Sequence, residues 1–197
     1  MNQAVNLDMT MMYAVHDAFR RDLAHIDRMT TWTEGWNRFS KFLHAHHVAE
    51  DEALWPVVRD AVGDQPDDVK LLDDMVTEHG GLGPLLEAID AALAHGESAP
   101  EARADLAARL QEHLTHEEEA ALPVIDRTLT EEQWMSFGEA STARIGVDMP
   151  QFLPWLLDGA ETERTKAVLG RLPEPAQQTY RDEWQPAYAA NAWWDDP

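Results

Sequence analysis

The sequence predicts an all-α protein, with an up-down-up-down four-helix bundle over residues 1–128 and an additional helical C-terminal extension over residues 129–197 that packs on the bundle. Two observations carry this prediction. Apolar residues recur every three or four positions in four successive stretches, and short links rich in Gly, Pro and acidic residues separate these stretches. No alternation typical of strands competes with this pattern, and four helices joined by short links favour a bundle of antiparallel neighbours.

Each of the four stretches has its own apolar stripe. The first predicted helix runs through Met12, Val15, Phe19, Leu23 and Ile26. The second follows TTWTEG, stops near Pro56, and runs through Trp36, Phe39 and Leu43. The third follows GDQPDD and runs through Leu72, Val76, Ile89 and Leu93. The fourth follows HGESAPEA and runs through Leu106 and Leu110, with Val124 just beyond Pro123. Because the ring of Pro84 meets the carbonyl of Gly80, we expect a kink just after His79.

The residues after about position 130 have a different composition. Thr130 followed by Glu-Glu-Gln predicts a helix N-cap and first turn, with the helix continuing through about Ser141. Beyond it the chain contains several prolines and tryptophans, and this segment is too rich in tryptophan to be a disordered tail. We expect short helices that fold back on the bundle, or a dimer contact in which the AWWDDP end takes part.

Composition excludes several classes of site and partner. The chain has 197 residues, no cysteine, and a formal charge of −22 from 15 basic and 37 acidic residues. Disulfides, thiolate catalysis and iron–sulfur clusters are therefore excluded, and nucleic-acid phosphates and anionic lipids are repelled. The N-terminal sequence MNQAVNLDMTMMYAVHD lacks the features of a signal peptide, and no apolar run is long enough to span a bilayer. We expect a cytoplasmic monomer or homodimer.

One thirteen-residue segment occurs twice and contains the same pair of polar residues each time. HHVAEDEALWPVV begins with His46 and reaches Glu50, whereas HLTHEEEAALPVI begins with His113 and reaches Glu117. Residues at i and i+4 project from one face of a helix, so each helix can offer an imidazole and a carboxylate to the same ion. Pro56 and Pro123 follow at equal distances, and we expect them to end two equivalent helices.

Two further histidines complete the pattern. His16 lies on the apolar stripe of the first predicted helix and His79 on that of the third, so the half from about residue 10 to 60 resembles the half from about 73 to 127. Packing the two halves together would bring six side chains into one cluster. Burying two glutamates and four histidines without a cation would carry a large desolvation cost, which favours a metal site over a purely structural cluster.

The ligand set indicates a dinuclear centre. Four imidazoles and two carboxylates are few ligands for two six-coordinate ions unless Glu50 and Glu117 bridge them, with a solvent-derived oxo or hydroxo group as a further bridge. Nitrogen and oxygen ligands without sulfur suit iron, although manganese or zinc could compete. We therefore predict two iron ions as the cofactor.

Several neighbouring residues are weaker candidates. His47 and Asp51 form a second i,i+4 pair about 100° around the helix from His46 and Glu50, so we expect them to be solvated or to support the ligands from outside. We expect His116 at the surface or the edge of the site, and Tyr13 in the core or lining the pocket. The remaining histidines are expected at the surface: His25, His44 and His95.

The order His16, His46-x-x-x-Glu50, His79, His113-x-x-x-Glu117 resembles the hemerythrin-like, HHE cation-binding domain family, in its bacterial H-HxxxE-H-HxxxE form, over about residues 10–127. This resemblance implies a four-helix bundle with a non-haem, oxo- or hydroxo-bridged di-iron site on those six residues. The oxygen-carrying members have a further histidine where this chain has Gly83, and an aspartate where it has Glu118. The missing histidine predicts a less saturated metal.

Three classes of function are compatible with a di-iron site of this kind. The first is a di-iron protein that binds or reacts with dioxygen, peroxide or nitric oxide in oxidative stress, redox sensing or iron handling. The second is an enzyme, either catalase-like or an oxygenase of an organic substrate. The third is an iron buffer or interaction module. An oxygenase needs a sizeable apolar pocket beside the metals, whereas a sensor or carrier needs only a narrow channel.

Overall fold

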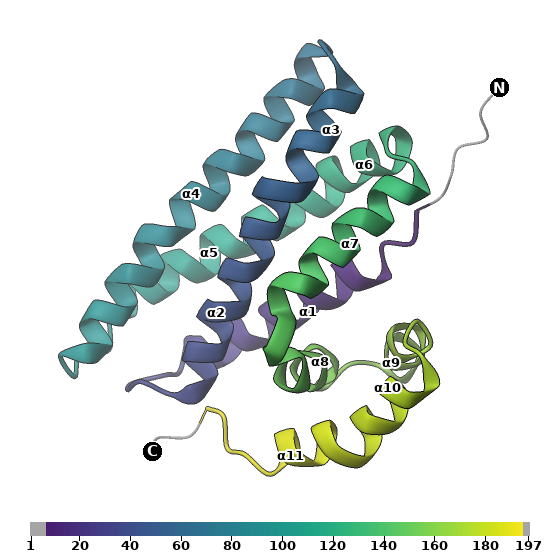
Figure 1. Ribbon diagram of the computed structural model, residues 1–197. Helices are drawn as coiled ribbons and strands as arrows, with labels where there is room; N and C mark the ends of the chain where they lie inside the picture. The colour runs from purple at the N-terminus through teal and green to yellow at the C-terminus, as the bar shows by residue number, and fades with distance from the viewer. Residues whose placement is uncertain (1–6, 195–197) are drawn as a thin grey trace.

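The computed structural model describes residues 7–194, and every regular element within that range is helical (Figure 1). Most of the bundle in Figure 1 consists of long helical rods joined end to end by short links. The first rod is α1 (Thr10–Ile26), and the third is α4 (Pro66–Ala94). The prediction of an all-α protein is confirmed over the described residues.

The second and fourth rods each contain a π-helical turn. The second consists of α2 (Glu34–Ala49), the π turn η1 (Glu50–Leu54) and α3 (Trp55–Val62). The fourth consists of α5 (Pro100–His116), the π turn η2 (Glu117–Ala121) and α6 (Leu122–Thr128). Each π turn begins at one of the two glutamates of the repeated motif, so the repeat in the sequence is also a repeat in backbone geometry.

The prediction that Pro56 and Pro123 end their helices is wrong. Each rod continues past its proline because the turn before the proline widens: the amide of Trp55 donates to the carbonyl of Glu50, and the amide of Leu122 donates to that of Glu117. A proline lacks the amide hydrogen of a regular turn and crowds the carbonyl four residues earlier. The wider turn, of the kind often found at functional sites, accommodates both defects without ending the rod.

The third rod also differs from its prediction. α4 is one helix from Pro66 to Ala94 with Pro84 inside it, and the kink expected after His79 stays a prediction. Val76, which we placed on the apolar stripe, is 46% exposed. The inward face of this helix instead carries Leu72, Met75 and Leu82. His79 follows Met75 by four residues and precedes Leu82 by three, so it still points inward.

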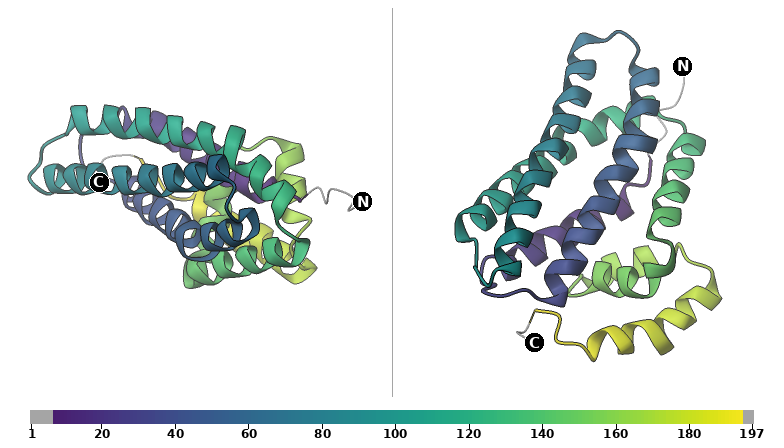
Figure 2. Two further views of the ribbon diagram at one scale, coloured as in Figure 1. Left: turned by 90° about the horizontal axis from the view of Figure 1, so that it is seen from above. Right: turned by 60° about the vertical axis from the view of Figure 1, so that its left-hand side comes forward.

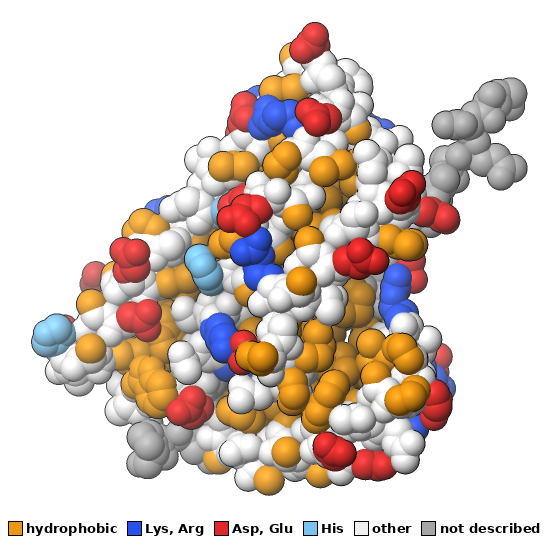
Figure 3. All heavy atoms as spheres, in the orientation of Figure 1, with side chains coloured by type: hydrophobic (Ala, Val, Ile, Leu, Met, Phe, Trp, Pro, Cys, Tyr) orange, Lys and Arg blue, Asp and Glu red, His pale blue; other side chains and the backbone are white. Residues whose placement is uncertain are grey.

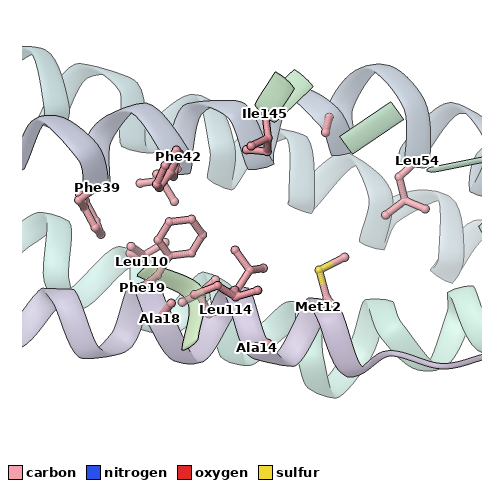
Figure 4. Packing of buried hydrophobic residues seen from close by; sticks show 14 of the residues in the cluster. Met12, Ala14, Ala18, Phe19, Phe39, Phe42, Leu54, Leu110, Leu114 and Ile145 are labelled. Atoms are coloured by element: carbon pink, nitrogen blue, oxygen red, sulfur yellow. The ribbon is translucent and has the colours of Figure 1, made fainter. Parts of the chain in front are cut away.

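Apolar residues pack at both ends of the predicted polar cluster. Figure 4 shows Phe19, Phe39 and Phe42 gathered towards one end, and Met12 and Leu54 lying towards the other. These five side chains are at most 4% exposed. His16 lies between Met12 and Phe19 in the sequence, and Glu50 lies between Phe42 and Leu54. The polar cluster is therefore held between two apolar layers.

After the four rods, α7 (Glu131–Ile145) packs along α2, as the views in Figures 1 and 2 agree. Thr130 forms the predicted N-cap, in a capping box with Gln133, and the helix runs four residues past Ser141. Ion pairs join the C-terminal end of α7 and the turn that follows it to the second rod: Arg144 Nη2 lies 2.5 Å from Glu52 Oε2, and Asp148 Oδ2 lies 2.6 Å from Lys41 Nζ. α7 thus covers a face of α2 that would otherwise meet solvent.

The remaining helices are short and curve around one end of the bundle (Figure 1). They are the 3₁₀ turn η3 (Gly146–Asp148), α8 (Met149–Leu157), α9 (Thr162–Leu169), α10 (Glu174–Thr179), the π turn η4 (Tyr180–Trp184) and α11 (Gln185–Ala189). Trp155 of α8 is fully buried against Phe19 and Phe42, and its indole N–H donates to Asp22 Oδ2 at 2.7 Å. The extension therefore shares the core of the bundle, whereas the division into domains at residue 128 stays a prediction.

The C-terminal segment is also fixed to the start of α2. The guanidinium of Arg38 lies 5.1 Å from the ring centre of Tyr188 and 4.3 Å from that of Trp193, which are cation–π distances. The amide of Gly35 donates to the carbonyl of Trp193 at 2.6 Å, and the ring of Trp194 stacks on His25. The two tryptophans of the AWWDDP end thus pack on their own chain, and residues 195–197 lie outside the described residues.

No helix within residues 7–194 combines the length and the apolar character needed to cross a membrane.

Gly35→Ala is expected to loosen the C-terminal segment. A Cβ at this position would lie 2.5 Å from Trp194 Cδ2 and 2.7 Å from the carbonyl oxygen of Trp193, which cannot shift without moving the backbone. Overpacking of this kind costs about 1–3 kcal/mol. Denaturant unfolding should show that loss, together with faster proteolysis after residue 170. The control is Gly138→Ala in α7, where a Cβ meets no atom within 4 Å and stability should rise by about 0.5–1 kcal/mol. Equal stability of the two variants would contradict the prediction.

Candidate metal centre

The structure brings the predicted ligands together in two adjacent groups. The first group is His16, His46, Glu50 and Glu117, and the second is His47, His79 and His113. Within each group, one ligand atom from every residue lies within 4.8 Å of all the others. α1 and the second rod contribute the histidines of the first group, whereas α2, α4 and α5 contribute those of the second. All six residues predicted from the sequence are included.

The two glutamates reach both groups. Glu50 Oε1 lies 3.3 Å from His46 Nε2, and its other oxygen lies 3.5 Å from His79 Nε2. Glu117 Oε2 lies 3.2 Å from His16 Nε2 and 3.8 Å from His113 Nε2. Each carboxylate therefore stands between the groups, as a residue that bridges two ions must.

Many polar atoms of the cluster have no hydrogen-bond partner. The buried atoms without a partner include both carboxylate oxygens of Glu50 and Glu117 and the Nε2 atoms of His16, His46 and His47. Such atoms are normally paired with protein, water or a metal, because leaving them bare in an apolar core costs free energy. These converge on one place and are all of the types that bind cations, so the residues present fit a metal site.

Carboxylates outside the cluster hold the far nitrogens of three imidazoles. Glu118 Oε1 lies 2.9 Å from His16 Nδ1, Asp51 Oδ1 lies 2.8 Å from His79 Nδ1, and Glu78 Oε2 lies 2.8 Å from His113 Nδ1. An ionised carboxylate accepts a hydrogen bond, so each Nδ1 carries a proton, and each Nε2, once deprotonated, can offer its lone pair to a cation in the centre. This carboxylate–histidine arrangement is typical of imidazoles that bind metals.

The contact between His79 and His113 also favours a bound cation. Their Nε2 atoms lie 3.2 Å apart. If both Nδ1 atoms donate to carboxylates, both Nε2 atoms are acceptors in the neutral rings, and two lone pairs at this distance repel one another. A cation that both nitrogens bind removes that repulsion.

The charges of the cluster are strongly perturbed. Burial and the neighbouring imidazoles keep the pKa values of His46 and His47 well below the usual value, so both rings are neutral. Burial alone would lower the pKa of His16, but Glu117 and Glu118 outweigh it and raise that pKa to about 9. Burial and the charge of Glu117 raise the pKa of Glu50 well above its usual value. A cation would replace these protons as the partner of the ligands.

His47 is the main correction to the sequence analysis. It is not solvated: it is 7% exposed, and its ring stacks on that of His79 with centres 4.1 Å apart. Leu43 lies four residues before His47, so the stripe of the second helix already contained the signal. α2 is covered on several sides, and His46 faces α1 while His47 faces α4. Its counterpart in the second half of the repeat is Leu114, so the similarity between the two halves gave no indication that His47 belongs to the cluster.

Other residues lie mostly as expected. Asp51 supports His79 from outside the cluster, and His116 is at the edge, where its Nδ1 lies 2.8 Å from Glu78 Oε1. Besides His16, Glu118 binds Arg20, whose Nη1 lies 2.7 Å from Glu118 Oε1 and whose Nη2 lies 2.9 Å from Glu118 Oε2. Tyr13 is 37% exposed, so it is not the core residue or pocket-lining residue of the centre that the sequence suggested. His44 and His95 are exposed, whereas His25 is half-buried against Trp194.

The comparison with known families agrees with the geometry. The family described as hemerythrin HHE cation binding domain matches residues 8–125. The chain belongs to this family. No curated protein and no solved structure matches the chain. As an HHE protein it has Gly83 where the oxygen-carrying members have a histidine, but the structure places a fifth imidazole, His47, beside His79 and His113. The two groups therefore contain five imidazoles, one more than the sequence predicted.

His47→Ala is expected to weaken cation binding by more than about 100-fold, because the loss of a ligand exceeds the 10–100-fold effect typical of outer partners. Competition with a chelator for ferrous or zinc ions measures the change. His44→Ala is the matched control, since His44 lies on the exposed side of the same helix and should bind as the wild type does. Unchanged affinity in His47→Ala would exclude His47 from the site.

Glu78→Ala is expected to lower cation affinity by about 10–100-fold without removing any residue of the two groups. Glu78 accepts from His113 Nδ1, so its loss frees that ring to rotate and to take the wrong tautomer. The same chelator assay applies, with the exposed Glu119→Ala as control. Equal affinity of the two variants would show that His113 needs no support.

Proposed function

We propose that this HHE protein is a non-haem di-iron protein that binds or reacts with dioxygen, peroxide or nitric oxide, in an oxidative-stress, redox-sensing or iron-handling role. The observation that carries the proposal is the convergence of unpartnered donor atoms in two groups that Glu50 and Glu117 connect. The proposal takes the four rods as the up-down-up-down bundle implied by the family.

His16 and His46 would hold one ion, and His47, His79 and His113 would hold the other. Glu50 and Glu117 would bridge them, because each has oxygen atoms near imidazoles of both groups. The donor set contains nitrogen and carboxylate oxygen but no sulfur, which suits iron and also admits manganese or zinc.

The two ions would not be equally saturated. The first has two imidazoles and two carboxylates, whereas the second has three imidazoles and two carboxylates. With the same solvent-derived bridge added to each, one further ligand position remains on the His16/His46 side. A small ligand would bind at that open position. The two ions would differ because His47 lies beside α4 rather than α1.

When bound, the iron pair would supply a redox-active Lewis acid for a small oxygen or nitrogen ligand. The residues of the chain set the conditions for that chemistry. Phe19 packs against the ring of His46, 5.5 Å between centres, and limits water on the open side. Glu118, bound by Arg20, keeps the imidazole of His16 turned towards the cluster.

Anaerobic loading of the purified chain with ferrous iron should give about two ions per chain, as expected for five imidazoles and two bridging carboxylates. Adding dioxygen, peroxide and nitric oxide separately should then change the visible absorption. A count near one, or the same count in a His46→Ala/His113→Ala double variant, would contradict the dinuclear proposal.

The same experiment separates binding from catalysis. Oxygen released from added peroxide over many turnovers would favour a catalase-like enzyme, whereas a single stoichiometric change would favour a sensor or carrier. Iron that is taken up but unaffected by all three small molecules would favour an iron buffer.

A further inference from the structure

An apolar cavity of about 670 Å³ lies between the bundle and the C-terminal extension. α1 and α2 form one wall, and α7, α8, the end of α9 and the residues just after it form the other. Figure 3 shows hydrophobic side chains gathered on this face of the molecule, beside the lower part of α7 and over the C-terminal helices. The volume is within the range of about 300–1,000 Å³ that is usual for sites of small organic ligands.

The cavity reaches the candidate metal centre at His46, which is part of its wall. The side chain of His46 is 10% exposed, whereas the other six residues of the two groups are at most 7% exposed. His46 belongs to the group with fewer imidazoles. The place where the cavity touches the cluster is therefore also the side on which a ligand position would remain.

The wall chemistry defines the occupant. Apolar side chains make up most of the wall, and thioethers and aromatic rings recur among them, including Met12, Phe42, Phe137 and Met149. Met side chains adapt to irregular apolar shapes, and aromatic faces bind flat or extended hydrocarbon groups. The cation in the wall, Arg171, is already neutralised, because its Nη1 lies 2.5 Å from Asp8 Oδ2. An anionic occupant would find no free cation there and would lose its hydration.

We propose that this cavity binds a neutral, apolar organic molecule with one end against His46. The binding itself does not depend on the metal, whereas its position beside a di-iron centre rests on the proposed function. The occupant would exclude water from the open side of the cluster, and small oxygen or nitrogen ligands would meet it there. This assigns the C-terminal extension a function: it builds the outer wall of an organic ligand site.

A blocking variant follows from the geometry of α7. Trp134, Gly138, Ser141 and Ile145 form one stripe of this helix, and all four line the cavity. A Cβ at Gly138 meets no atom within 4 Å, so a leucine fits there without displacing backbone and extends from the cavity-lining stripe. Ser141→Leu fills the same stripe one turn further on. Ser136→Leu is the matched control, because Ser136 is exposed on the opposite side of α7.

The test is a titration of the metal-free full-length chain with N-phenylnaphthylamine, a neutral probe whose fluorescence rises in apolar sites. We expect saturable binding of one probe per chain, weakened at least about tenfold in Gly138→Leu and Ser141→Leu and unchanged in Ser136→Leu. The sulfonated, anionic analogue should bind at least about tenfold more weakly than the neutral probe. Absent saturation, full binding by both cavity variants, or equal binding of the anionic analogue would overturn the proposal.

A second titration uses the iron-loaded, air-oxidised chain. Binding of the probe beside His46 should change the absorption of the iron centre in the wild type and not in Gly138→Leu. Probe binding without any such change would overturn the placement against His46. A failure of iron loading would count against the proposed function alone, since the first titration needs no metal.

Discussion

The burial of ionisable groups in the middle of the bundle is the constraint on which the rest of the structure depends. Glu50 and Glu117 have no exposed surface, and the imidazoles around them are almost as deeply buried. Carboxylates in an apolar core are costly unless charge and hydrogen bonds compensate them. The outer carboxylates of Glu78, Asp51 and Glu118 satisfy only the far side of the rings. A cation is the partner that satisfies the inner side.

The backbone is shaped to deliver those groups. The two π turns begin at Glu50 and Glu117, and each ends two residues before a proline. The wide turn accommodates the proline and lets the rod continue, so apolar residues such as Leu54 and Val124 can pack on the far side of the cluster. The same arrangement precedes Pro186, where η4 contributes no residue to either group of candidate ligands, so a π turn forms before this proline without them.

The C-terminal extension packs on the bundle and also encloses the cavity that reaches the candidate metal centre. Trp155 fills the core beside Phe19 and ties α8 to the buried carboxylate of Asp22. Arg38 and Gly35 hold the last residues against the start of α2. These contacts fix the extension against the bundle, and α7, α8 and the end of α9 then enclose an apolar cavity that opens on His46. The four rods alone would leave that imidazole near solvent.

The sequence by itself determined the helical class, the four apolar stripes apart from Val76, and the inward position of His16, His46, Glu50, His79, His113 and Glu117, because helical periodicity reports which face a residue occupies. It did not determine how many faces of a helix would be covered. Only the tertiary structure decided that α2 is buried on several sides, which brings in His47, and that the prolines widen turns instead of ending helices. The cavity at His46 was also decided there, because residues more than 90 positions apart in the chain, such as Met12 and Phe137, line it together.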